Sequence, residues 1–146
     1  MNRVSKAQQL LRASELINNG FGTPIVAAET GLSSQYLRKL YRELQGIPSK
    51  SGLLPEANSI VKSRTALLQG SLLASLYLQI SGEAIYQRLD IDGLVLAYHN
   101  YLALAAEAKL TKRRPWQRIP IDHAWILARD LKAGLARLHL CNCGSP

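Results

Sequence analysis

The sequence predicts a mainly α-helical protein, with an N-terminal helix-turn-helix unit of three helices, a following helical bundle and a short C-terminal tail of strand or coil. Three observations predict this fold class. Apolar residues recur at helical spacing over most of the chain, turn-forming residues separate these segments, and only the last stretch alternates as a strand does. At 146 residues and 47% hydrophobic content, the chain can form one compact protein or two small domains.

The first helix is expected over residues 4–18. Its apolar side chains lie on one helical stripe, and Asn18, Asn19 and Gly20 form a stop signal at its end. We expect this helix to pack across the next two helices, which gives a three-helix unit over residues 1–46.

Residues 23–44 match the pattern of a helix-turn-helix. Pro24 suits a first helical turn, where a backbone N–H would lack a partner in any case. Gly31 lies at the turn, where the backbone needs a left-handed conformation, and Ser33 can cap the second helix. Apolar side chains are expected to fix the angle between the helices, namely Val26, Leu32, Leu37 and Leu40. The pattern favours a DNA-binding unit over an ordinary helical hairpin with a solvated basic face.

The second helix of this motif carries the candidate DNA-reading residues. Its exposed side has donors, acceptors and positive charge, with no carboxylate before Glu43. In a major groove, Gln and Arg side chains read base edges, while Lys and Arg side chains contact phosphates. The candidate DNA-binding residues on this helix are Ser33, Ser34, Gln35, Arg38, Lys39 and Arg42.

A linker is expected over residues 47–56, where turn formers are frequent, and residues 57–134 are expected to form a helical core and oligomerisation region. Its first helix, in one piece or two, is expected over residues 56–80. Apolar residues repeat there at every fourth position, at Leu68, Leu72, Leu76 and Ile80, and the stripe is widened by Leu67, Leu73 and Tyr77. So broad an apolar stripe suggests burial against more than one neighbour. A core helix and a partner-facing helix both fit this pattern.

Two more helices are expected in this region. One is capped by Asp90 or Asp92 and runs to about Ala108. The other begins at Asp122 and ends at Ala133, directly before a glycine.

A basic loop over residues 109–120 joins these two helices. It carries five of the eight net positive charges of the chain and no acidic residue. Such a concentration of charge suits DNA phosphates, and each contact adds about one unit to the slope of log affinity against log salt. The candidate phosphate contacts are Lys112, Arg113, Arg114 and Arg118. A solvated connector is the alternative.

Residues 135–146 form a tail whose alternating pattern indicates a short strand. Both cysteines, Cys141 and Cys143, lie in this tail, and so close a pair argues against a disulfide-stapled extracellular domain. The N-terminus lacks the apolar segment of a signal peptide, and residues 65–82 are too polar for a membrane span of marginal length. We therefore expect a cytoplasmic protein with no membrane partner.

The sequence contains no catalytic constellation, and we do not expect an enzyme. His99 lies in an apolar helix, where a core histidine is expected, and the adjacent Asp122 and His123 point apart on a helix. A recombinase fragment would need a nucleophilic side chain among activating arginines. Tyr98 and Tyr101 lie instead in an apolar, arginine-poor stretch.

Short motifs occur in a characteristic order along nearly the whole chain. They are Ala28-Glu29-Thr30-Gly31-Leu32-Ser33, Leu40-Tyr41-Arg42-Glu43-Leu44-Gln45-Gly46, Gly52-Leu53-Leu54-Pro55, Ala97-Tyr98, Tyr101-Leu102 and Ala124-Trp125-Ile126-Leu127-Ala128-Arg129. This order resembles the FlhC family of flagellar master regulators, whose relatives also activate transfer genes of conjugative elements. The stretch from Leu32 to Pro55 is the most specific part of the resemblance.

The resemblance implies a cytoplasmic transcriptional activator that binds double-stranded promoter DNA in a hetero-oligomer with an FlhD-type partner. In the family, two FlhC-type chains join four partner chains on a promoter. RNA polymerase is a further implied partner, and flagellar and conjugative-transfer operons are both open as targets. The alternative function is a helical interaction or adaptor module without specific DNA binding.

The family also carries a C-terminal zinc region with two cysteine pairs, and the tail departs from that pattern. It contains one Cys-x-Cys pair, Cys141 and Cys143, in place of the Cys-x-x-Cys turns that aim two sulfurs at one ion. His139 could add a ligand from the same face of a strand, which still leaves the set incomplete. Zinc bound by this set and two unpaired thiols are both open.

Overall fold

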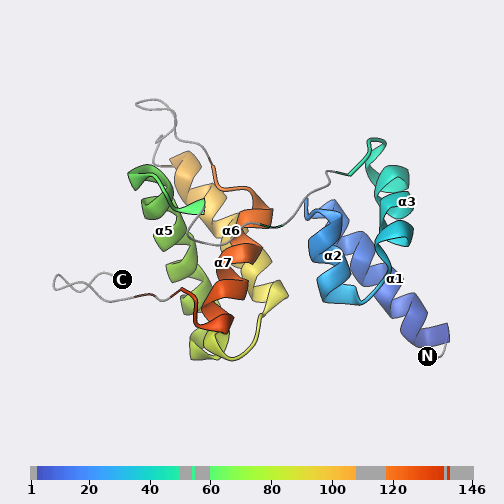
Figure 1. The fold of residues 1–146 in the computed structure, drawn as a ribbon. Helices are drawn as coiled ribbons and strands as arrows, with labels where there is room; N and C mark the ends of the chain where they lie inside the picture. The colour runs from blue at the N-terminus through green and yellow to red at the C-terminus, as the bar shows by residue number, and fades with distance from the viewer. Residues whose placement is uncertain (1–2, 50–53, 55–59, 108–117, 137, 139–146) are drawn as a thin grey trace. The chain divides into compact units, whose positions relative to one another are not determined.

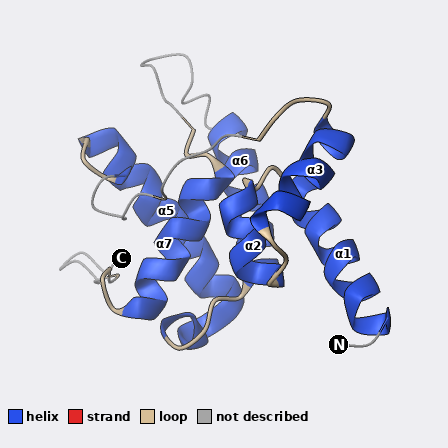
Figure 2. Cartoon of the chain, turned by 45° about the vertical axis from the view of Figure 1, so that its right-hand side comes forward, coloured by secondary structure: helices blue, strands red, loops and turns tan. Residues whose placement is uncertain are grey.

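The computed structural model describes residues 3–49, 54, 60–107, 118–136 and 138. Six α-helices and one 3-10 helix lie in this part of the chain, and no strand occurs among its residues (Figures 1 and 2). The prediction of a mainly α-helical protein is therefore confirmed. The chain divides into two compact units, Met1–Leu54 and Pro55–Pro146, which are described separately.

The first unit contains three helices, α1 (Arg3–Asn18), α2 (Thr23–Thr30) and α3 (Ser34–Gln45) (Figure 1). Each of the three contacts the other two. Their shared core consists of side chains that are almost completely removed from solvent, namely Ala13, Leu16, Ile17, Phe21, Ile25, Val26 and Leu37. Burial of each larger apolar side chain contributes about 1.5–3 kcal/mol, so this core sets the crossing of the three helices.

The turn between α2 and α3 has the predicted chemistry. Gly31 adopts a left-handed conformation with φ +77°, and the hydroxyl of Ser33 accepts the N–H of Tyr36 at 3.2 Å. Gln9 of α1 donates a hydrogen bond of 2.8 Å to the carbonyl of Thr30, which would otherwise lack a helical partner. The turn is therefore fixed by its own residues and by α1.

The second unit contains α5 (Arg64–Ser81), the 3-10 helix η1 (Gly82–Tyr86), α6 (Ile91–Glu107) and α7 (Ile121–Ala133). The three α-helices pack on one another, and η1 contacts both α5 and α7 (Figure 1). The centre of the unit is formed by large buried side chains, namely Leu73, Tyr77, Ile85, Leu94, Tyr101 and Ile126.

Helix α5 buries part of the predicted apolar stripe. Residues 61–63 are not helical, and the hydroxyl of Ser63 caps α5 by accepting the N–H of Ala66 at 3.0 Å. The start predicted at residue 56 falls outside the described residues. The buried side of α5 is formed by Gln69, Gly70, Leu73, Ala74 and Tyr77, so Leu73 and Tyr77 of the predicted stripe are core residues. The repeat at every fourth position lies beside this side, and its member Leu68 is 60% exposed.

Asp90, and not Asp92, caps the start of α6. One carboxylate oxygen of Asp90 accepts the N–H of Gly93 at 3.1 Å, and the other accepts the hydroxyl of Ser81 at 2.9 Å. The N–H of Asp90 in turn donates to the hydroxyl of Tyr77 at 2.9 Å. A Cβ at Gly93 would collide with Ser81 Oγ and lie 2.6 Å from Asp90 Oδ2, so this network requires glycine.

One prediction for the second unit was wrong, and one helix boundary differs by a residue. His99 is exposed and is not a core residue. Helix α7 begins at Ile121 after Pro120, one residue before the predicted start, and the carboxylate of Asp122 in its first turn interacts favourably with the helix dipole. Most of the predicted strand in the tail lies outside the described residues. At its beginning, the N–H groups of residues 135 and 136 turn back to the carbonyl of Asp130 at 2.9 and 3.1 Å, and residues 135, 136 and 138 are not in a strand.

Candidate nucleic-acid interface

The exposed face of α3 gathers all six candidate DNA-reading residues. Leu37 is the buried residue of α3 and turns the opposite side of the helix to the core. The side chains on the outer face are exposed, as predicted for Ser33, Ser34, Gln35, Arg38, Lys39 and Arg42. Gln35, Arg38, Lys39 and Arg42 follow the i, i+3, i+4, i+7 spacing of one helix face. Within the described residues, no carboxylate pairs with the three cationic groups.

Both ends of α3 are held in place. The Ser33 cap fixes its first turn, and the side-chain amide of Gln45 donates to the carbonyl of Ile17 in α1 at 3.4 Å. Gly46 then ends the helix in a left-handed conformation with φ +73°. A helix fixed at both ends presents its outer face as a rigid surface, which is the geometry that base reading requires.

Two residues that sequence reasoning did not single out lie beside the start of α3. Lys6 of α1 and Tyr36 of α3 line a groove of about 490 Å³, together with Ala7, Gln9, Leu10, Gly31, Leu32 and Ser33. Lys6 is exposed, and Tyr36 is 44% exposed. No pattern in the sequence marks Lys6, because its place beside α3 depends on how α1 crosses the turn.

Of the predicted basic-loop contacts, the structure describes one. Arg118 is exposed directly before the buried Ile119, whereas Lys112, Arg113 and Arg114 lie outside the described residues. Arg118 belongs to the second unit and the α3 face belongs to the first, so the two are separate candidate surfaces.

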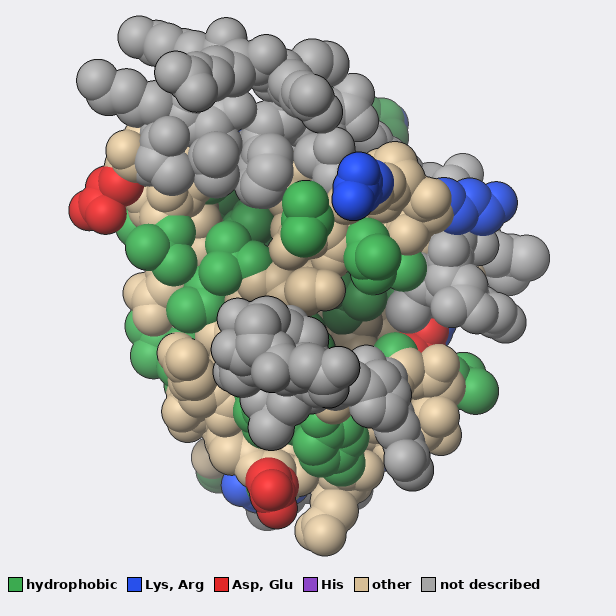
Figure 3. Space-filling view, turned by 90° about the vertical axis from the view of Figure 1, so that its left-hand side faces the viewer, with side chains coloured by type: hydrophobic (Ala, Val, Ile, Leu, Met, Phe, Trp, Pro, Cys, Tyr) green, Lys and Arg blue, Asp and Glu red, His purple; other side chains and the backbone are tan. Residues whose placement is uncertain are grey.

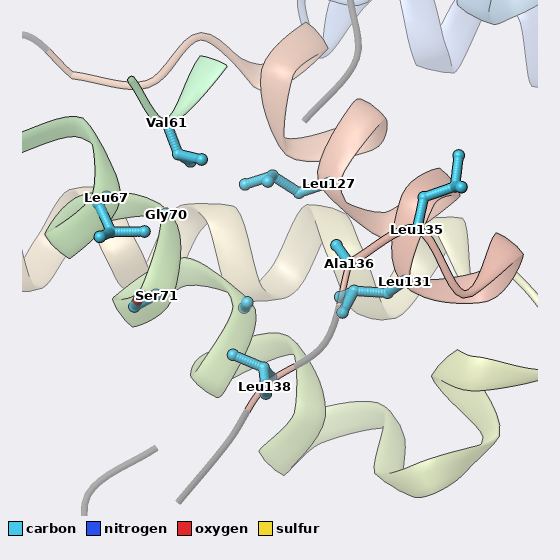
Figure 4. A pocket seen from close by; sticks show the side chains of 10 residues that line it. Val61, Leu67, Gly70, Ser71, Leu127, Leu131, Leu135, Ala136 and Leu138 are labelled. Atoms are coloured by element: carbon cyan, nitrogen blue, oxygen red, sulfur yellow. The ribbon is translucent and has the colours of Figure 1, made fainter. Parts of the chain in front are cut away.

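An apolar groove of about 290 Å³ lies between α5 and α7 in the second unit (Figure 4). Its lining contains no charged side chain and consists of Val61, Leu67, Gly70, Ser71, Ala74, Leu127, Leu131, Leu135, Ala136 and Leu138. Figure 3 shows hydrophobic side chains spread over the face of the molecule on which α5 lies in Figure 1. Leu67 and Leu135 at the groove are 51% and 67% exposed, so this face has no cover within the described residues. A face of this kind is typical of an interaction surface.

The described residues contain no cluster of three or more His, Cys, Asp or Glu side chains that could hold a metal ion. The candidate zinc ligands Cys141 and Cys143, with His139, lie outside those residues. Among the helices that the structure describes, none combines the length and apolar character needed to span a membrane.

Asp122 and His123 are neighbours in the first turn of α7. Burial lowers the pKa of His123 below its ordinary value of 6.5, and the neighbouring Asp122 carboxylate opposes this shift. Adjacent helical positions point apart, and neither residue lines a described cavity.

Comparison with known proteins matches nearly the whole chain to one family. A family model for the flagellar transcriptional activator FlhC matches residues 2–145. Proteins named flagellar transcriptional regulator FlhC from Serratia marcescens, Paraburkholderia atlantica and Proteus mirabilis are each 30% identical, over 96%, 97% and 94% of this chain. The chain spans 69%, 62% and 68% of the length of these three relatives.

Proposed function

Because the chain belongs to the FlhC family of flagellar transcriptional activators, we propose that it binds promoter DNA in a sequence-specific manner through the outer face of α3. The observation that carries this proposal is the exposed face of Gln35, Arg38, Lys39 and Arg42, whose cationic groups have no carboxylate partner among the described residues, on a helix fixed at both ends. In this proposal α2, the Gly31 turn and α3 act as a helix-turn-helix.

The residues of this face have distinct roles in the proposed complex. Gln35 and Arg38 lie in the first half of α3, and the N-terminal residues of a recognition helix reach base edges. Lys39 and Arg42 contact phosphates, as do Ser33 and Ser34 through their hydroxyl groups. Lys6 of α1, beside the start of α3, extends the row of phosphate contacts, and Arg118 supplies another from the second unit.

We further propose that an FlhD-type partner chain covers the apolar face of α5 and the groove beside α7. The exposure of Leu67, Leu68 and Leu135 supports this, because a charge-free apolar face resembles the core of a stable interface. Contact with RNA polymerase stays a prediction, as does zinc binding by Cys141 and Cys143. Flagellar operons are the proposed targets by family, and conjugative-transfer operons are the alternative.

The apolar face also favours a second candidate function, that of an adaptor that binds proteins and has no specific affinity for DNA. The two functions differ in their response to substitutions on α3. An adaptor would keep its affinity for its protein partner when the cationic side chains of this helix are removed, and it would have no specific DNA affinity to lose.

The double variant Arg38→Ala with Arg42→Ala tests the proposed function. We expect it to lower the affinity for promoter DNA at least about tenfold, since one good base contact alone discriminates by about 1–3 kcal/mol. Arg88→Ala is the matched control, because Arg88 is an exposed arginine outside α3 and outside the basic loop. Equal affinities of the double variant and the control would exclude α3 as the recognition helix. Affinity is measured with the full chain, alone and co-purified with its partner.

A further inference from the structure

Two tyrosine hydroxyls of α6 fix the backbone on both sides of Ile119. The hydroxyl of Tyr98 donates to the carbonyl of Ile119 at 2.7 Å. The hydroxyl of Tyr101 accepts the N–H of Ile119 at 3.2 Å and donates to the side-chain oxygen of Gln69. The N–H of Ile119 belongs to the peptide group that joins it to Arg118. The peptide plane directly after Arg118 is therefore held by α6.

Other contacts remove the remaining freedom at this point. The side chain of Ile119 is 4% exposed, so it is anchored in the core. The next residue, Pro120, has a φ of −62°, and a proline restricts the backbone of the residue before it to extended conformations. Arg118 is thus an exposed cation attached to a stiff backbone.

The hydrogen bond from Tyr98 to Ile119 links the phenol to the residue directly after Arg118. Burial is the main cause that raises the pKa of Tyr98 above its ordinary value of 10.0, and Tyr101 and Asp122 add to this effect. The guanidinium of Arg118 opposes this rise in pKa. Tyr98, Ile119 and Arg118 are therefore connected through the backbone that leads into α7.

We propose that Tyr98 is a positioning residue for the separate candidate phosphate contact at Arg118. By fixing the carbonyl of Ile119, Tyr98 holds Arg118 ready for a DNA phosphate. This inference rests on the proposed DNA-binding function and adds a residue that never touches DNA. The physical reason is preorganisation. An arginine on a fixed backbone loses less conformational entropy when it binds a phosphate than one on a mobile backbone.

A double-mutant cycle on DNA affinity tests the proposal, with Tyr98→Phe, Arg118→Gln and the combined variant in the full chain co-purified with its partner. Affinity for promoter DNA is measured over a range of salt concentrations. Arg118→Gln is expected to lower the slope of log affinity against log salt by about one unit. Tyr98→Phe is expected to lower the slope in the same direction, with a loss of affinity of about three- to tenfold at low salt. In the Arg118→Gln background, Tyr98→Phe should have no further effect.

The salt slope separates positioning from a loss of folded protein, because a smaller active fraction lowers affinity and leaves the slope unchanged. Tyr86→Phe is the matched control, since it removes a hydroxyl from the half-buried Tyr86 of η1. Melting temperatures of all variants are compared. Arg118 is exposed, so Arg118→Gln is expected to leave the protein folded. The salt dependence of its DNA affinity can therefore be measured even if Tyr98→Phe destabilises the protein.

Three results would overturn the proposal. The first is an unchanged slope for Arg118→Gln, and the second is full additivity of the two substitutions. If either occurs while Arg38→Ala with Arg42→Ala still lowers the affinity for promoter DNA as expected, the proposed function stands and the role of Tyr98 fails. The third is an absence of salt-dependent DNA affinity in the unmodified protein, which would contradict both the proposed function and the role of Tyr98.

Discussion

The hydroxyl of Tyr98 donates a hydrogen bond of 2.7 Å to the carbonyl of Ile119, which lies 21 positions later in the chain. This bond joins the middle of α6 to the residue that precedes the first turn of α7. It lies beside a tilted contact between the rings of Tyr98 and Tyr101, whose centroids are 5.8 Å apart. The two tyrosines thus connect the apolar core of the second unit to the end of its most basic segment.

Tyr101→Phe is expected to destabilise the protein by about 1–3 kcal/mol, because it leaves the buried Gln69 oxygen and the N–H of Ile119 without this partner. Chemical denaturation measures the change. The double variant Tyr101→Phe with Gln69→Leu should recover part of the lost stability, since it also removes the Gln69 oxygen that Tyr101→Phe leaves without its donor. A Tyr101→Phe variant as stable as the unmodified protein would contradict this role of the hydroxyl.

Gly93→Ala is expected to destabilise the protein by about 1–3 kcal/mol, even though alanine is the better helix former by about 1 kcal/mol. The reason is the collision of a Cβ with Ser81 Oγ and the cap of Asp90. Thermal and chemical denaturation measure the effect. Ser81→Ala in the same background should relieve part of it. A stabilised Gly93→Ala protein would show that the cap network can move aside at no cost.

Protonation of His123 is expected to lower stability in mild acid. Burial lowers the pKa of His123 below 6.5, so between that value and the lower pKa of the folded state the unfolded chain binds more protons. The free energy of unfolding therefore falls as pH drops through this window, and His123 has no such effect above it. Denaturation between about pH 5 and pH 8 should show a flatter profile for His123→Gln. His99→Gln is the matched control, because His99 is exposed.

The combined variant Leu67→Ser with Leu68→Ser is expected to abolish co-purification with an FlhD-type partner and to change stability by less than about 1 kcal/mol. Both side chains are more than half exposed, and substitutions at exposed positions usually have small effects on stability. Leu96→Ser on α6 is the matched control, since Leu96 is 53% exposed. Retention of the partner by the double variant would exclude the apolar face of α5 as its binding surface.

Local rules predicted much of the fold and the α3 face. The left-handed Gly31, the Ser33 cap and the outward face of Arg38 follow from backbone sterics, capping chemistry and helical periodicity, which act over a few residues. The start of α7 was predicted one residue late, because Asp122 and Pro120 are both acceptable near a helix start and periodicity does not choose between them.

Tertiary contacts account for what the sequence did not predict. The hydrogen bonds of Tyr98 and Tyr101 could not be predicted from the sequence, because the partners of their hydroxyl groups lie 21, 18 and 32 positions away. The burial of Gln69 could not be predicted either, since only the crossing of α5 and α6 brings it to Tyr101. The place of Lys6 beside α3 could not be predicted for the same reason, because it depends on how α1 crosses the turn between α2 and α3.

The most direct test of the central claim is an in vitro selection from fragmented genomic DNA, with the unmodified chain and its Gln35→Ala and Arg38→Ala variants, each co-purified with the partner. A shared motif is expected for the unmodified protein, and each variant should show relaxed preference at particular positions of that motif, because base contacts determine sequence specificity and phosphate contacts do not. Arg88→Ala should recover the full motif. Identical motifs from all four proteins would contradict base reading by α3, and recovery of no motif by any of them would leave only nonspecific electrostatic binding.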